Sequence, residues 1–249
     1  MRTSNPALSD KAFQTDAPAS GKVMTINGTV NKTGMLLSLC IFVAAVSWDK
    51  AFTAAEQTGS AAALFPWMIG SSIAGLIIAL ITVFKKTAAP ITAPLYAIVE
   101  GVFIGIISAF FEMSYPGIVF QAATLTFGVL FALLLAYRSG LIKATENFKL
   151  GIAAATGGIF LVYLASMVLG FFGISMPLIH DSGVIGIGFS LFVVVIAALN
   201  LVLDFDFIEN GAAQGAPKYL EWYAAFGLLV TLIWLYIEIL RLLSKLRSR

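Results

Sequence analysis

The sequence predicts an all-α integral membrane protein in which seven transmembrane helices form a bundle. Two observations lead to this fold class. Of the 249 residues, 59% are hydrophobic and 11% are charged, whereas soluble domains carry about a quarter charged residues. The apolar residues also come in blocks of roughly 17 to 25, which is the length that a helix needs to cross a bilayer.

Proline and glycine residues mark the ends of these blocks. Pro66, Pro94 and Pro217 are expected in the first turns of the second, third and seventh helices, where a missing N–H costs little. The pair Asn210-Gly211 is expected to end the sixth helix. The expected spans are Thr33–Trp48, Phe65–Phe84, Pro94–Phe111, Gly117–Tyr137, Leu150–Phe172, Gly183–Phe207 and Pro217–Leu243.

The chain divides by composition into three parts. Residues 1–32 are polar and contain no apolar core of signal-peptide length, so they are expected to form a disordered, solvent-exposed arm. Residues 33–245 form the transmembrane domain, and residues 246–249 form a basic tail.

The basic residues predict how the chain is oriented. If the N-terminus is cytoplasmic, the outer loops between the first six helices hold only Lys50, and the inner segments hold the other basic residues up to Lys218. Cytoplasmic loops are enriched in lysine and arginine. We therefore expect a multi-pass membrane protein with its N-terminus in the cytoplasm.

Seven full spans would place the basic residues from Arg241 onward outside. Either the earlier residues set the orientation, or the last segment enters the membrane and returns; we favour seven spans, because Pro217–Leu243 is long enough to cross.

Small residues in the third span predict close helix packing. Gly101 and Gly105 lie four residues apart, and small residues at this spacing let the backbones of membrane helices approach each other. We expect this motif to act within one bundle.

Several functional classes lack their characteristic residues. The sequence contains no basic stripe interleaved with aromatic residues, so a nucleic-acid partner is not expected. The single cysteine, Cys40, excludes an intrachain disulfide and a cysteine-rich metal site. No hydrolase, P-loop or dinucleotide motif is present, so we expect neither an enzyme nor a cofactor.

The acidic residues inside the expected spans are the main functional signal. A charged side chain at the centre of a membrane helix costs about 2.5 to 3.5 kcal/mol. Basic residues are too few at these depths to neutralise all the acids, so protons, cations or water must compensate, and such a cluster responds to pH and to cations. The candidate ion-sensing and proton-sensing residues are Glu100, Asp204, Asp206, Glu221 and Glu238.

Structural roles are possible for some of these acids. Arg241 follows Glu238 by three residues on the same helical face and could form a local ion pair with it. Lys85 or Lys86 could extend from the end of the second helix to reach Glu100.

The sixth and seventh spans resemble a known family. The run ALNLVLDFDFIE at 198–209, followed by EWYAAFG at 221–227 and LYIEILRLL at 235–243, looks like the bacterial branch of the Bax inhibitor family, the transmembrane Bax-inhibitor-motif proteins. The run EGVFIG at 100–105 resembles the signature of that family's third helix. The resemblance covers about residues 33 to 245.

This resemblance implies a bundle whose last helix is central, and a calcium leak that pH controls through two carboxylates. The acid in the sixth helix matches Asp204, or Asp206, and the acid in the seventh matches Glu238, so Asp204 and Glu238 become candidate calcium ligands. Hairpin geometry, at about 1.5 Å per residue, instead places Glu221 at the depth of Asp204 and Asp206. Both pairings stay open.

Two functions therefore follow as hypotheses. The first is a pH-sensitive passive cation (calcium) leak channel in the lipid bilayer, gated by carboxylates that take up protons or calcium. The second is a regulatory membrane protein without transport, which would bind membrane proteases or stress-response partners. The first needs a polar path and the second needs a partner surface.

Overall fold

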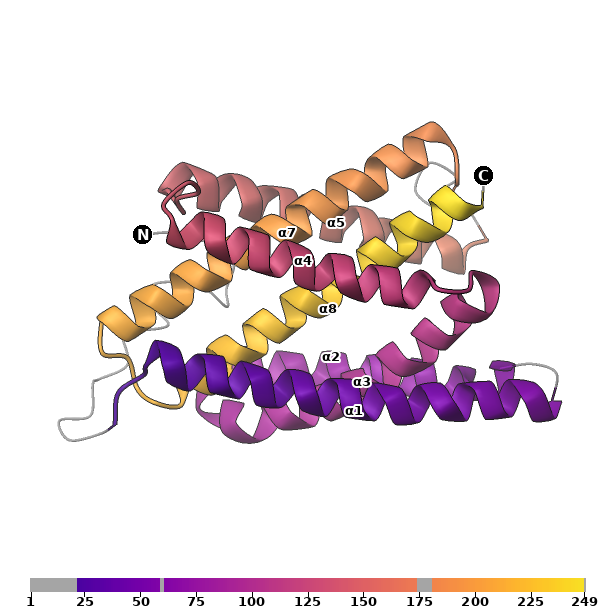
Figure 1. Cartoon of the computed structure of the whole chain (residues 1–249), viewed down its shortest axis with the longest axis horizontal. Coiled ribbons are helices and arrows are strands. Elements are labelled where there is room, and N and C mark those ends of the chain that lie inside the picture. Colours follow the sequence, from indigo (N-terminus) through magenta and orange to yellow (C-terminus); the bar gives the residue numbers. More distant parts are fainter. Residues whose placement is uncertain (1–21, 59–60, 174–180, 249) are drawn as a thin grey trace. The chain divides into compact units, whose positions relative to one another are not determined.

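The computed structural model describes residues 22–58, 61–173 and 181–248. Within these residues, seven α-helices are long and apolar enough to cross a membrane, which confirms the predicted fold class. Figure 1 shows them as α1 (Ile26–Thr58), α2 (Phe65–Phe84), α3 (Ala89–Ser114), α4 (Ile118–Arg138), α5 (Glu146–Phe171), α7 (Val184–Ala213) and α8 (Leu220–Arg247). The short 3₁₀ helices η2 (Ala61–Leu64) and η3 (Lys86–Ala88) precede α2 and α3.

The outer faces of the helices carry large apolar side chains. Phe42, Phe120 and Leu135 are among those exposed. Water solvates such side chains poorly, whereas lipid tails solvate them well. The chain is therefore a multi-pass integral membrane protein that contacts the bilayer. Of the most apolar stretch of α8, 50% is buried, the largest share among the seven helices. That α8 lies at the centre of the bundle stays a prediction.

The described residues form two compact units. Unit 1 contains residues 117–206 and 231–248, and unit 2 contains residues 22–116 and 207–230. Unit 1 thus holds α4, α5, most of α7 and the later part of α8. Unit 2 holds α1 to α3, the end of α7 and the first turns of α8.

In unit 2, α1 and α2 both pack against α3. A Cβ atom added to Gly101 would lie 2.7 Å from the Cys40 carbonyl oxygen, and one added to Gly105 would lie 2.3 Å from the Ala44 carbonyl oxygen. Both distances are too short for any side chain. The predicted close approach within the bundle is confirmed, and it joins α3 to α1.

In unit 1, α5 and α7 run antiparallel. Lys149 contacts Asp206, and Thr156 contacts Asn200, so residue numbers fall along α7 as they rise along α5. The interface is mainly apolar. Its core contains the buried side chains of Ile152, Ile159, Val193, Ile196 and Leu203, and Trp234 of α8 packs against it.

The helix α1 begins inside the range expected to be a polar arm. Its first residue is Ile26 rather than Thr33. The hydroxyl oxygen of Thr25 accepts a hydrogen bond of 3.0 Å from the Gly28 amide, as the residue that caps a helix N-terminus does. An apolar window misses such polar turns. Residues 1–21 of the expected arm lie outside the described residues.

The start of α3 also differs from the expectation. The helix begins at Ala89, so Pro90 lies in the first turn and Pro94 lies inside the helix. A proline inside a helix removes the hydrogen bond from its own nitrogen, and its ring crowds the carbonyl four residues earlier. At Pro94 both effects fall in the first two turns of α3. The later proline was therefore the wrong marker.

The connection between α7 and α8 lies further along the chain than expected. The helix α7 passes through Asn210 and Gly211 and ends at Ala213. Gly215 then adopts a left-handed conformation, with φ of 65°, which glycine adopts without strain. The helix α8 starts at Leu220 and continues to Arg247, into the expected tail.

Candidate functional site

Glu221 is buried in the first turn of α8, where it is fully paired within unit 2. Its side chain is 0% exposed. The amide and the hydroxyl of Thr25 each donate to Oε1 at 3.0 Å. Lys32 forms an ion pair with Oε2, and the Lys218 ammonium lies 3.8 Å from Oε1. Glu221 is therefore one of the acids that an ion pair neutralises, and its main basic partner, Lys32, comes from a helix distant in the sequence.

Backbone bonds reinforce this contact. The Met24 amide donates to the Ala216 carbonyl at 2.7 Å, and the Lys218 amide donates to the Lys22 carbonyl at 3.2 Å. Val23 and Pro217 form an antiparallel bridge. The segment before α1 is therefore fastened to the connection between α7 and α8. We call residues 22–25 together with 216–221 the clasp.

Asp206 is also paired with a basic residue. The Lys149 ammonium of α5 lies 2.7 Å from Asp206 Oδ2 and 3.5 Å from Glu146 Oε1. The lysine and Asp206 are both partly exposed, so water or lipid headgroups can share in solvating the pair. Asp206 is therefore also among the acids that an ion pair neutralises.

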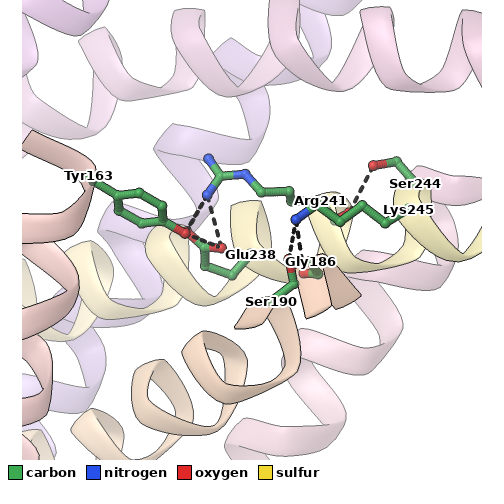
Figure 2. Close-up of polar contacts among 7 residues, drawn as sticks. All are labelled: Tyr163, Gly186, Ser190, Glu238, Arg241, Ser244 and Lys245. Atoms are coloured by element: carbon green, nitrogen blue, oxygen red, sulfur yellow. Dashed lines mark hydrogen bonds and ion pairs between the residues drawn. The ribbon is translucent and has the colours of Figure 1, made fainter. Parts of the chain in front are cut away.

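Glu238 forms the local ion pair with Arg241 that was considered as a structural alternative. Arg241 Nη1 lies 2.9 Å and 3.1 Å from the two carboxylate oxygens. It also donates to the Tyr163 hydroxyl at 2.6 Å. The tyrosine hydroxyl lies 3.1 Å from each Glu238 oxygen, and Figure 2 shows the three side chains converging. The carboxylate charge is compensated.

One turn further along α8, Lys245 anchors the helix to α7. Its ammonium donates to the Gly186 carbonyl at 3.0 Å and to the Ser190 hydroxyl at 2.8 Å. Lys245 is buried, so these oxygens replace water around its charge. With Arg241, it makes this end of α8 basic.

Asp204 has no such partner. Its side chain is 7% exposed. The Thr231 hydroxyl donates a hydrogen bond to this carboxyl group. Its Oδ2 atom has no hydrogen-bond partner among the described residues, and it is the one buried side-chain oxygen or nitrogen there of which this is true. A buried carboxyl oxygen without a donor is unfavourable if the group is charged.

Glu100 also lacks a basic partner among the described residues. The Tyr96 hydroxyl, one turn earlier on α3, donates to it. A Cβ atom added to Gly75 of α2 would lie 2.7 Å from Glu100 Oε1. Lys86, which was considered as a partner, instead lies over the Tyr223 ring, with its ammonium 5.5 Å from the ring centroid. Unlike Asp204, Glu100 is only partly buried.

The structure does not bring Asp204 and Glu238 together. Asp204 contacts Thr231 and Glu238 contacts Tyr163. Thr231 and Glu238 are seven residues apart on α8, which is about 10 Å along a helix. Among the residues described, no three His, Cys, Asp or Glu side chains gather as metal ligands. A cation at Asp204 would therefore need other oxygen ligands.

A comparison with protein families identifies the chain. The family described as Bax inhibitor 1 like matches residues 5–248. The chain belongs to this family. A comparison with curated proteins gives no match. The resemblance found in the sixth and seventh spans is thus confirmed, and it extends over nearly the whole chain.

In this Bax inhibitor 1 like chain, sequence reasoning missed one polar residue next to Asp204. Asn200 of α7 is buried, and its amide nitrogen donates to the Thr156 hydroxyl at 2.9 Å and to the Ile196 carbonyl at 2.8 Å. Asn200 lies within the apolar run that carries the family resemblance, and a polar amide there was the available signal. Asparagine does not titrate, so a pattern of ionisable residues does not include it.

Proposed function

We propose that this membrane protein forms a passive, pH-sensitive leak for cations such as calcium, and that Asp204 is the group that controls it. The observation that carries the proposal is that its carboxyl group is buried and incompletely hydrogen-bonded within the described residues. Asp204 is 7% exposed, and its Oδ2 atom is without a partner among the described residues. Such a group becomes neutral by taking up a proton or by holding a cation.

The two states of this carboxyl group supply a gate. A protonated Asp204 carries no charge and does not attract a cation. A deprotonated Asp204 offers Oδ2 to a cation, while Thr231 continues to donate to the group.

The charged groups that form ion pairs or hydrogen bonds on α5, α7 and α8 in unit 1 do not replace this role. They are the Lys149–Asp206 pair on α5 and α7, and on α8 the Glu238–Arg241 pair with Lys245, which α7 oxygens bind. In each of the two pairs a positive charge offsets a negative one. The charge that varies is therefore that of Asp204, which depends on whether a proton or a cation is bound to it.

The other candidate acids have different roles in this proposal. Glu100 is a second group that can respond to protons, because no described base contacts it. Asp206, Glu221 and Glu238 serve mainly as members of ion pairs. We assign no catalytic residue, enzymatic activity or cofactor, and calcium is cargo. We further propose an inner-membrane location with the N-terminus in the cytoplasm.

Flux measurements in proteoliposomes that contain a calcium dye test this function. The wild-type protein should release calcium at a rate that changes with pH, and Asp204→Asn should remove most of that change. Asp206→Asn, the same substitution two residues away in an ion pair, should retain it. The absence of flux from the wild-type protein would refute the leak, and equal pH profiles for both variants would refute the role of Asp204.

A regulatory function without transport is the second candidate. The clasp favours it, because it fastens the end of the N-terminal arm to the connection between α7 and α8. A partner that binds the arm could act on these helices. Deletion of residues 1–21 tests this: loss of a cross-linked membrane partner with calcium flux unchanged would support docking through the arm. A bound partner in the absence of any flux would favour regulation over the leak.

A further inference from the structure

A polar stripe runs along the face of α5 that contacts α7 and α8. Lys149, Thr156 and Tyr163 follow one another at intervals of seven residues, which is about two turns, so they share one face of the helix. Each contacts a polar residue of another helix, at 2.7 Å (Asp206), 2.9 Å (Asn200) and 3.1 Å (Glu238). Unit 1 therefore contains three polar levels.

Apolar side chains separate these levels. Ile152 lies between Lys149 and Thr156 along α5, and Ile159 lies between Thr156 and Tyr163. Both are buried in the apolar core of unit 1, with Ile196 of α7. The outer levels are ion pairs, and the middle level is the uncharged pair Asn200–Thr156.

The orientation of the Asn200 amide is fixed by its neighbours. The Ile196 carbonyl is only an acceptor, so the amide group that faces it must be the NH₂. Its two hydrogens are directed to Ile196 at 2.8 Å and to Thr156 at 2.9 Å. The carbonyl oxygen Oδ1 must therefore point elsewhere, and it remains available as an acceptor.

Asp204 lies one helical turn after Asn200 on α7. Asn200 and Asp204 are four residues apart, a spacing that puts two side chains on the same helical face with Cβ atoms about 5–6 Å apart. One contributes a neutral carbonyl oxygen, and the other contributes Oδ2, which is buried without a donor. Carboxylate and amide oxygens are the ligand types that calcium prefers.

We propose that Asn200 Oδ1 and Asp204 Oδ2 together form the cation-binding step of the leak, and that Thr156 positions the Asn200 amide. This inference rests on the proposed leak and adds its ligands. Two protein oxygens leave most of the coordination shell to water. Binding of this incomplete kind suits an ion in transit, because conduction requires that the ion can leave.

A purely structural role for the Asn200–Thr156 pair makes different predictions. Side-chain hydrogen bonds between membrane helices hold a bundle together, and their loss lowers thermal stability alone. A cation-binding step also sets which ion passes. The ratio of calcium flux to sodium flux, measured per folded protein, therefore distinguishes the two roles.

The test compares variants in proteoliposomes with calcium and sodium dyes. Asn200→Leu should lower calcium flux at least tenfold and lower the calcium-to-sodium ratio. Thr156→Val should lower calcium flux about fivefold, the effect of one lost hydrogen bond, and Thr156→Ser should restore it. Thr124→Val is the matched control, because the Thr124 hydroxyl bonds only to Phe120 of its own helix, and it should change neither quantity.

The outcomes separate this inference from the proposed function. If the wild-type protein shows no flux, the leak itself fails. If Asp204→Asn alters flux while Asn200→Leu and Thr156→Val leave both the rate and the ratio unchanged, the leak stands and the ligand assignment is overturned. A lower melting temperature with an unchanged ratio would likewise reduce the pair to a structural contact.

A second measurement covers the case in which Asn200→Leu does not fold. In a Cys40→Ala background, Asn200→Cys places a thiol at the proposed step. Its calcium flux should be lower than that of the background protein, and cadmium ions should block the flux that remains. Val195→Cys lies on the exposed face of the same helix and should remain insensitive. Equal sensitivity of the two variants, or none in either, would overturn the proposal.

Discussion

Two buried carboxylates on neighbouring helices, Glu221 and Asp204, meet opposite environments. Glu221 accepts two hydrogen bonds from Thr25 and forms an ion pair with Lys32. Asp204 receives one bond, from Thr231, and its Oδ2 atom has no donor among the residues that the structure describes. Both are nearly inaccessible to solvent. Burial of an acid in a membrane protein therefore does not by itself identify a functional site, and the set of partners decides.

The largest expected effect comes from breaking the paired carboxylate. Lys32→Met leaves Glu221 buried without its main cation, and removal of one partner from a buried ion pair costs about 3–5 kcal/mol. We expect a large fall in the melting temperature of the purified protein, followed by tryptophan fluorescence. Lys22→Met is the control, because the Lys22 side chain is exposed. Equal melting temperatures for the two variants would show that the ion pair between Lys32 and Glu221 contributes little.

The glycine contacts of unit 2 give the next largest effect. Gly105→Ala adds a Cβ atom 2.3 Å from the Ala44 carbonyl oxygen, and overpacking of this kind costs about 1–3 kcal/mol. Gly128→Ala, in α4, meets nothing within 4 Å, and alanine in a helix is favoured over glycine by about 0.5–1 kcal/mol. The two variants should therefore shift the melting temperature in opposite directions, and a shift of the same sign would contradict the close packing of α1 and α3.

The unpaired carboxylate should respond in the opposite way to the paired one. Asp204→Asn removes a group that is costly to bury when it is charged. The free energy of unfolding at neutral pH should therefore stay constant or rise by up to about 1 kcal/mol, and the melting temperature should stay constant or rise with it. Glu221→Gln, the equivalent change in the clasp, should lower it. If Asp204→Asn destabilises the protein as much as Glu221→Gln does, then Asp204 is a structural acid too.

The smallest effect is expected at the partly exposed pair. Lys149→Gln removes the ammonium group 2.7 Å from Asp206, and exposed ion pairs contribute about 0–1 kcal/mol. Its melting temperature should lie within a few degrees of the wild-type value. A fall as large as that of Lys32→Met would mean that Asp206 depends on its lysine as strongly as Glu221 does.

The sequence alone was sufficient for the number and order of the membrane helices, because apolar length is a local property. It could not supply the pairings between acids and bases that lie far apart in the sequence. Lys32 and Glu221 are 189 positions apart, and nothing near Glu221 in the sequence reveals that a lysine of the first helix reaches it. Arg241 was foreseen as a partner of Glu238 because it lies within one turn.

The helix ends were missed for a related reason. The first turns of α1 are polar and are held by the Thr25 cap, which an apolar window does not detect. At the end of α7, the pair Asn210-Gly211 looked like a stop, but Gly215 has the left-handed backbone. Asn200 was overlooked because its importance depends on Thr156, a residue of another helix.

The most direct test of the contrast between the two carboxylates is infrared difference spectroscopy between acidic and alkaline pH, with and without calcium. We predict a protonated-carboxyl band that calcium diminishes, that is lost in Asp204→Asn and that persists in Glu221→Gln, while a second band from Glu100 remains in both variants. A band that survives in Asp204→Asn and disappears in Glu221→Gln would contradict the assignment of Asp204 as the group that exchanges protons and cations.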